Sequence, residues 1–152
     1  MIRNLGKLFL ALCLLTVGGG VVANAQIDSD SRIEANVPFA FVVGKTTLPA
    51  GKYEIKGIDD NTPGVLELRS ANGRKPIVFE TDAARTRDDE PATKTELVFD
   101  KIGDNYFLSQ VWAEGNDSGS QVVKSKMEKR LEADGTRTER HSIAAILRRL
   151  KP

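Results

Sequence analysis

The feature that most constrains the fold of this chain is an alternation of apolar and polar residues with a period of two between Ile33 and Trp112. Successive side chains of a β-strand point to opposite faces of a sheet, so this period is typical of half-buried strands. Lys52–Lys56 is the clearest case, because Tyr53 and Ile55 share one face and three charged residues share the other. The pattern predicts an antiparallel sheet with one face on a core and one in water.

Turn-forming residues divide this region into short segments. Asn72-Gly73 and Gly103-Asp104 predict tight hairpins, because these residue types tolerate positive φ angles. The Leu48–Tyr53 segment reads as a turn that delivers an aromatic ring to the core. Thr81–Lys94 is polar and predicts a long mobile loop. About seven strands are expected between these turns, over residues 39–43, 46–48, 52–56, 65–70, 74–80, 95–102 and 105–113.

After Ser120 the apolar residues follow a helical spacing. Residues 121–132 are rich in Lys, Glu and Arg, with apolar residues every four positions (Val123, Met127, Leu131). After Gly135, Ser142 is a candidate N-cap for a last helix. The apolar residues that follow lie at i, i+3, i+4 and i+7 (Ile143, Ile146, Leu147, Leu150). We therefore expect a helical tail from about residue 121.

These segments predict a mainly β fold: a single antiparallel β-sandwich or open barrel of about seven strands, with one or two C-terminal helices. The tail's apolar stripe is expected to cover a sheet face or an open barrel mouth. We expect one domain over residues 33–152, a size that buries a sufficient core without crosslinks.

The N-terminus is typical of a secretory signal peptide. Two basic residues precede an uncharged, mostly apolar run over residues 8–22, and Ala23-Asn24-Ala25 is a small-x-small cleavage site. The run is shorter than the roughly 20 residues of a membrane-spanning helix. We expect cleavage after Ala25, a disordered leader over residues 26–32, and a periplasmic or extracellular product. Cleavage would also remove Cys13, the single cysteine, and so exclude disulfides. A retained N-terminal anchor is the alternative.

Charge is unevenly distributed along the expected mature chain. From Gln121 onward nine basic residues stand against four acidic ones, whereas residues 26–120 carry 11 basic and 17 acidic residues. The basic tail fits three roles: a solvated helix, a contact with the acidic body of the same molecule, or an anionic surface such as phospholipid, lipopolysaccharide or cell-wall polymer. The near-neutral total charge and the expected compartment argue against nucleic acid.

Two stretches of the chain resemble a known set of proteins. Val37-Pro38-Phe39-Ala40-Phe41-Val42-Val43-Gly44 and Leu48-Pro49-Ala50-Gly51-Lys52-Tyr53 form the first, and Leu97–Trp112 with Lys124–Lys129 forms the second. Together they resemble small predicted secreted bacterial proteins of unknown function, which share a VPFxFxVG…LPAGxY…LVFxxxGDxYFLSQxW pattern. The resemblance covers about half the mature chain. It implies export and a β-domain, and it carries no active site.

Reactive chemistry finds little support in the sequence. One histidine, His141, and no cysteine after Ala25 argue against a zinc site, and the acidic pairs match no calcium loop. There is no G-x-S-x-G or S-x-x-K motif. Paired carboxylates would suit a glycoside hydrolase, but the sequence does not single out two. We therefore predict no catalytic residues, no metal and no cofactor.

The candidate binding residues are weakly marked. Tyr106 and Trp112 are expected on one face of a strand, where they would form a glycan or peptide platform if exposed. The cations Lys124, Lys126, Lys129 and Arg130 are candidates for contact with an anionic envelope component. The leading hypothesis is an exported, non-enzymatic β-domain for interaction or envelope-associated binding. The alternatives are a barrel-like carrier of a small apolar ligand and a carboxylate-based hydrolase.

Overall fold

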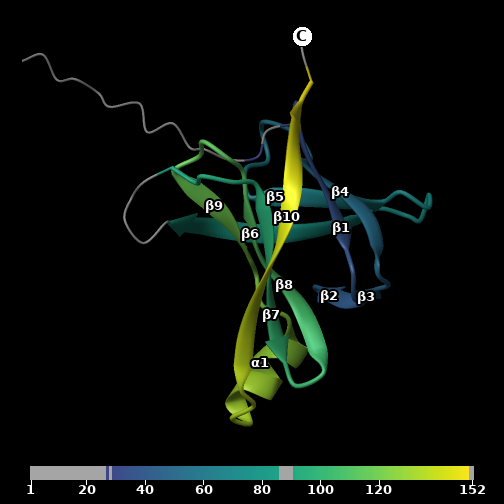
Figure 1. Ribbon diagram of the computed structural model, residues 1–152, viewed down its shortest axis with the longest axis vertical. Helices are drawn as coiled ribbons and strands as arrows, with labels where there is room; N and C mark the ends of the chain where they lie inside the picture. The colour runs from purple at the N-terminus through teal and green to yellow at the C-terminus, as the bar shows by residue number, and fades with distance from the viewer. Residues whose placement is uncertain (1–26, 28, 86–90, 151–152) are drawn as a thin grey trace, which may run out of the picture.

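The computed structural model describes residues 27, 29–85 and 91–150, except for the side chain of Arg85. It is mainly β, as predicted, with ten strands and one short helix in the described part (Figure 1). The elements are β1 (Ser31–Val37), β2 (Phe41–Val43), β3 (Thr46–Leu48), β4 (Gly51–Gly57), β5 (Val65–Ser70), β6 (Ile77–Arg85), β7 (Glu96–Ile102), β8 (Asn105–Trp112), β9 (Ser118–Val122), α1 (Lys126–Ala133) and β10 (Thr138–Arg149).

Eight of the strands close into an antiparallel barrel, which corrects the expected sandwich or open barrel of about seven strands. The order around the barrel is β8-β7-β10-β1-β4-β5-β6-β9, and the ring closes because β9 also pairs with β8. The short β2–β3 hairpin lies outside the ring, with β2 parallel to β8. Closure satisfies the backbone groups that an open sheet would leave along its edges.

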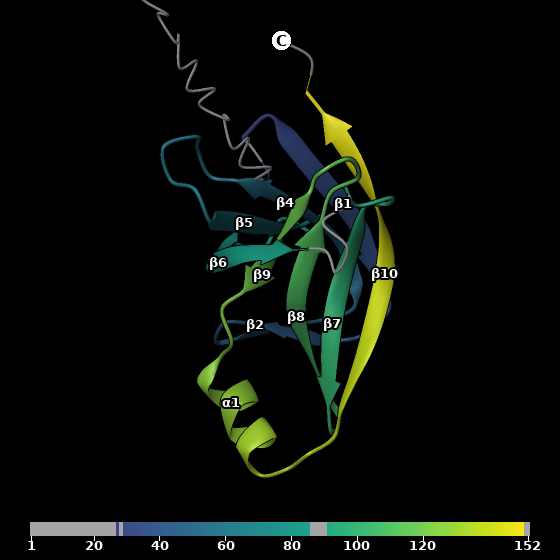
Figure 2. The same ribbon diagram turned by 90° about the vertical axis from the view of Figure 1, so that its left-hand side faces the viewer.

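Two long strands turn the corners of the barrel. The first half of β10 pairs with β7 and its second half with β1, while β6 pairs first with β5 and then with β9. Figure 2 shows β10 curving along one side of the molecule for most of its length. Because each long strand belongs to two sheets, the barrel is two sheets joined at shared strands.

The predicted last helix is wrong, since residues 138–149 form β10. Its inward residues are half-buried and its outward residues exposed, a strand alternation (inward His141, Ile143, Ala145, Leu147; outward Ser142, Ala144, Ile146, Arg148). Ser142 caps no helix and instead pairs with Val98 of β7. Tertiary pairing decided the outcome, because β10 fills the gap between β7 and β1 that closure requires.

The other predicted helix exists but is shorter. It begins at Lys126 rather than residue 121, because residues 118–122 form β9 and close the barrel. Ser125 is the N-cap, and its hydroxyl accepts a hydrogen bond from the Glu128 N–H at 3.1 Å. Gly135, at φ 76°, follows the helix, as the sequence indicated.

Large side chains fill the barrel interior. Phe41 and Phe99 are among the fully buried residues, and their ring centroids lie 5.3 Å apart in an edge-to-face arrangement. Tyr53 is buried, as the Leu48–Tyr53 turn predicted, and its hydroxyl donates to the Pro49 carbonyl at 2.6 Å. The predicted inward pair of β4, Tyr53 and Ile55, is confirmed.

Several expected boundaries differ from the structure. The expected loop 81–94 is shorter, because β6 continues to Arg85; residues 86–90 lie outside the described part. β1 begins at Ser31, inside the expected leader, and Ile27 is buried. The expected signal peptide lies outside the described residues. Among the residues described, we find no helix long and apolar enough to span a membrane.

Candidate functional site

A β-bulge places Tyr106 and Trp112 on opposite faces of β8. Leu108 pairs with Phe99 but Gln110 pairs with Val98, so β8 carries one extra residue at this point. Without that residue, positions 106 and 112 would share a face, as the even spacing predicted. The expected common platform is therefore wrong.

Each of the two aromatic rings is packed rather than presented. The ring of Tyr106 stacks on Phe39 with centroids 3.8 Å apart and meets the His141 ring edge-on at 5.4 Å. Trp112 is only 9% exposed and lies in an outer cluster with Ala84 and Val98. Its ring is so close to Gly119 that a Cβ there would come within 2.7 Å. Neither ring offers an open stacking surface.

A chain of side-chain hydrogen bonds runs along the outer face from Trp112 to Asp100. Trp112 Nε1 donates to Gln110, Gln110 donates to Gln121, and Gln121 donates to the Ser109 carbonyl. The Ser109 hydroxyl then donates to Asp100 Oδ2 at 2.7 Å. Asp100 is 3% exposed, so this network satisfies a carboxylate buried outside the barrel core.

Beside this network, α1 turns its acidic residues toward the barrel. Glu128 is 4% exposed, while Lys124 and Glu132 are half-buried and form an ion pair with each other. Leu131 packs on an outer apolar cluster that includes Ile102 and Phe107. Lys124 therefore pairs with Glu132 on the side of the helix that faces the barrel, and it is set apart from the exposed cations of α1.

Burial raises the pKa of Glu128 to about 6, against the opposing influences of Lys124 and the Ser125 backbone N–H, which lower it. A carboxyl whose folded pKa lies above its ordinary value of 4.5 favours folding in its protonated form. The stability contributed by this proton is fully present below pH 4.5 and is lost as the pH rises through about 6.

The variant Glu128→Gln tests this burial. Because Gln cannot ionise, the variant is expected to be more stable than the wild type by about 2 kcal/mol at pH 7.5 and equal to it at pH 4. Urea unfolding at the two pH values measures the difference. Glu139→Gln, at an exposed residue of β10, is the matched control and should change stability by less than about 0.5 kcal/mol at both. A pH-independent difference for Glu128→Gln would contradict the buried position.

Within α1 the exposed side chains include three cations and Met127 but neither acid of the helix, while the exposed Asp134 caps its C-terminus. Lys126, Lys129 and Arg130 are all exposed. Met127 is 47% exposed and Val123, four residues before it, is 42% exposed. We call these five residues the basic face. The structure therefore brings together three of the four predicted cations and adds two apolar side chains to them.

Two other cations of the tail contact acidic residues of the barrel, which is one of the roles expected from the sequence. Arg140 Nε lies 3.2 Å from Asp100 Oδ1, and Arg148 Nε lies 2.9 Å from Glu34 Oε1. Both pairs join β10 to a neighbouring strand of the barrel. These cations are therefore less available to a partner than those of the basic face.

Within the described part of the chain, no metal centre or catalytic arrangement of side chains is found. The described residues contain no group of three or more His, Cys, Asp or Glu side chains arranged to hold a metal ion. The His141 ring meets the Tyr106 ring edge-on, and its Nε2 lies 3.9 Å from a carboxylate oxygen of Glu139. Among the described residues, no Ser or Thr hydroxyl is in hydrogen-bond contact with His141. Asp100 of β7 and Glu128 of α1 are carboxyl groups that are both buried, at 3% and 4% exposed. A hydrolase would need them open to substrate.

Comparisons with known proteins do not add a family. No protein-family model, no curated protein and no solved structure matches this chain. The resemblance to secreted bacterial proteins stays a prediction. The features that bear on function are the basic face of α1 and the buried carboxyl groups beside it.

Proposed function

We propose that this chain is an exported, non-enzymatic binding domain that attaches to anionic phospholipid surfaces of the cell envelope through the basic face of α1. The proposal includes removal of residues 1–25 before the domain works in the periplasm or outside the cell. The mass of the purified native product tests the removal directly, since a product that begins at Met1 would contradict it.

The separation of charges around α1 is the observation that carries this proposal. The helix directs Glu128 and Glu132 toward the barrel and exposes Lys126, Lys129 and Arg130. If α1 only faced water, the protein would be more stable with the acids of the helix exposed as well, because burying Glu128 costs free energy. The result is a cationic surface that anionic headgroups attract by about 1 kcal/mol for each Lys or Arg near the membrane.

The apolar pair of the basic face supports a membrane over a soluble anion. Met127 is exposed among the cations of α1, and Val123 is exposed in the segment just before the helix. Interfacial helices combine cations that meet headgroups with apolar side chains that enter the boundary of the acyl chains. A soluble anion would give exposed Met and Val no favourable contact.

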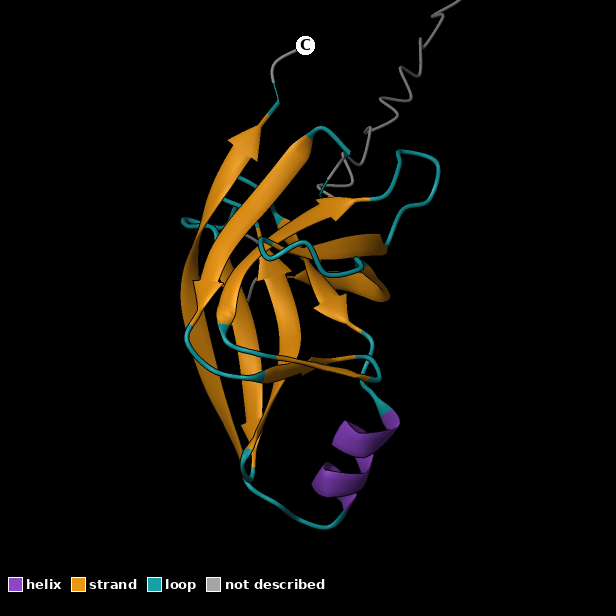
Figure 3. Ribbon diagram, turned by 90° about the vertical axis from the view of Figure 1, so that its right-hand side faces the viewer, coloured by secondary structure: helices purple, strands orange, loops and turns teal. Residues whose placement is uncertain are grey.

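The position of α1 also supports contact with a flat surface. Figure 3 shows the helix at one end of the elongated molecule, beside the ends of the long strands and away from the C-terminus. Arg137, whose side chain is 87% exposed, follows the helix after Gly135. A surface at this end can reach the basic face without a clash from the barrel.

The two other functions considered from the sequence have less support. A carrier needs room inside the barrel, where Phe41, Phe99 and other fully buried side chains lie. An eight-stranded barrel can be filled by side chains or can hold one small ligand, and the large buried rings favour filling. For the hydrolase the sequence singled out no two carboxylates, and the buried pair of candidates in the structure, Asp100 and Glu128, is closed to a substrate.

Vesicle co-sedimentation tests the proposal. The chain from Gln26 to Pro152 is expected to bind vesicles that contain phosphatidylglycerol and not vesicles of pure phosphatidylcholine. Replacing three cations (Lys126→Gln, Lys129→Gln, Arg130→Gln) should weaken the affinity about 100-fold, which is about 1 kcal/mol for each charge. Binding should also fall as salt is raised, because exposed charges are screened.

A charge-matched control separates a local effect from net charge. Replacing three exposed cations elsewhere (Arg74→Gln, Lys75→Gln, Arg149→Gln) lowers the net charge equally and should change the affinity less than about threefold. Equal losses in the two triple variants would overturn the role of the basic face. Binding to lipopolysaccharide without binding to phosphatidylglycerol vesicles would overturn phospholipid as the partner.

A further inference from the structure

A groove of about 690 Å³ lies on the outer face of the sheet formed by β10, β1, β4 and β5. Its lining residues lie on these strands and on the turn after β5, and none of them belongs to the basic face. Outward side chains form its walls, and small residues lie between them. The lining residues that matter here are Glu34, Glu54, Asn36, Lys52, Ala144 and Ile146.

The strand register arranges this face in rows. Glu34 of β1 lies opposite Glu54 of β4, and Asn36 lies opposite Lys52 in the next outward row. The two acids are held by arginines: Arg148 contacts Glu34 at 2.9 Å, and Arg32 contacts Glu54 at 3.3 Å. An acidic row and a row of hydrogen-bond donors therefore run side by side across the groove.

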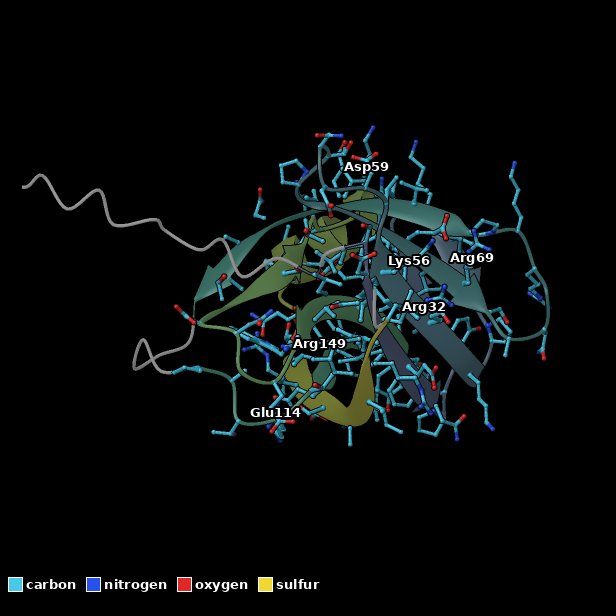
Figure 4. All side chains as sticks on the ribbon, turned by 90° about the horizontal axis from the view of Figure 1, so that it is seen from above. Arg32, Lys56, Asp59, Arg69, Glu114 and Arg149 are labelled. Atoms are coloured by element: carbon cyan, nitrogen blue, oxygen red, sulfur yellow. The ribbon has the colours of Figure 1, made fainter. Side chains whose placement is uncertain are left out.

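The side chains of the donor row, Lys52 and Asn36, are free to donate hydrogen bonds to a ligand. Lys52 is exposed and forms no ion pair with the residues that the structure describes, and Asn36 is exposed beside it. Arg69, on the neighbouring strand, pairs with Glu67 and also lines the groove. Figure 4 labels Arg32 and Lys56, which lie opposite each other in the register of β1 and β4, and Arg69 of β5, which lies opposite Glu54. A carboxylate that enters the groove would meet Lys52 without displacing an existing partner.

The distance between the rows suits a small molecule with two opposite charges. Adjacent outward residues of a strand are two positions apart, which is about 7 Å. Ala144 adds a small side chain to the lining, and Ile146, 57% exposed, lies opposite Glu34. A short extended peptide has an ammonium group at one end and a carboxylate at the other, a few ångströms or a few residues away, with a small apolar body between them.

We propose that this groove binds a short zwitterionic peptide in extended form, with its ammonium group at Glu34 and Glu54 and its carboxylate at Lys52 and Asn36. The groove is a second site, and it does not depend on the basic face of α1. A peptide contacts both rows at once, with its ammonium group sharing the carboxylates that Arg148 and Arg32 already contact, whereas a simple anion or cation would use one row only.

Isothermal titration with di-, tri- and tetra-alanine tests the groove. Each peptide is used with free ends, with an acetylated N-terminus and with an amidated C-terminus. Free peptides are expected to bind, with the strongest binding at two or three residues, and either block should weaken binding at least tenfold. In Lys52→Gln the free peptide should bind at least tenfold more weakly, and amidation should have no further effect.

The controls make a failure informative. Lys45→Gln, at an exposed residue of the β2–β3 turn, should bind the peptides as the wild type does. Equal affinity of free and blocked peptides, or no heat with any peptide at millimolar concentration, would overturn the proposal. The triple variant of the basic face should keep its peptide affinity, so loss of membrane binding and loss of peptide binding are told apart.

Discussion

A chain that ends at Gly135 is expected to show no cooperative unfolding transition. Such a chain lacks β10, which pairs with β7 over residues 138–144 and with β1 over residues 145–149. Its loss opens the barrel and leaves two long unpaired edges. It also exposes buried residues on both neighbouring strands, among them Ile33 and Phe99. Circular dichroism during urea titration measures the transition.

The control for this truncation is a chain that ends at Leu150, which keeps every residue of β10 and should unfold like the wild type. A second variant, Ala145→Pro, removes the hydrogen bond from the Ala145 N–H to the Thr95 carbonyl at 3.0 Å. It should lower the unfolding free energy by about 3 kcal/mol or more. A Gly135 truncation that unfolds cooperatively with near-wild-type stability would mean that the tail is an accessory segment.

Residues 138–149 were predicted to contain a helix but form β10, because their apolar pattern is compatible with both structures. Ile143 and Leu147 lie on one face of either a helix or a strand, since they are four residues apart. Ile146 fits the helical stripe but is 57% exposed on the strand. The short-range pattern therefore fitted both structures. Pairing with β7 and β1, which lie far away in the sequence, decided between them.

By contrast, local signals were sufficient for some early strands, although no strand was expected over residues 31–37, where β1 lies. In β4 the alternation of Tyr53 and Ile55 with charged residues has a single interpretation, and the structure confirms it. The first tail helix was also predicted, although not its start. The Ser125-x-x-Glu128 spacing is a capping box and could have placed that start at Lys126.

The candidate sites were less predictable than the strands. One extra residue in β8 separates Tyr106 from Trp112, and nothing in the local sequence marks a bulge there. Glu128 lies among lysines in a segment typical of a solvated helix, yet it is buried. The groove depends on which residues lie opposite each other on β1 and β4, and that register follows from the whole barrel.

The barrel interior has to supply the stability that disulfides give to many exported domains, because the single cysteine, Cys13, lies in the expected signal peptide. Phe99 lies at the centre of this interior. It is 0% exposed, and its ring meets Phe39 and Phe41 edge-on at 5.1 and 5.3 Å. This part of the barrel therefore depends on one aromatic cluster, built from Phe99 of β7, Phe41 of β2 and Phe39 just before β2.

Phe99→Ala is expected to lower the free energy of unfolding by about 4 kcal/mol, because it removes a buried ring and leaves a cavity that its neighbours cannot fill. For a domain of this size, such a loss is a large part of the total stability. Urea unfolding measures it, with Val78→Ala as the control, since Val78 is 55% exposed and should change stability by less than about 0.5 kcal/mol. A loss below about 1 kcal/mol for Phe99→Ala would mean that the ring borders open space. The barrel would then be hollow, and a carrier of a small apolar ligand would again be the better account of the fold.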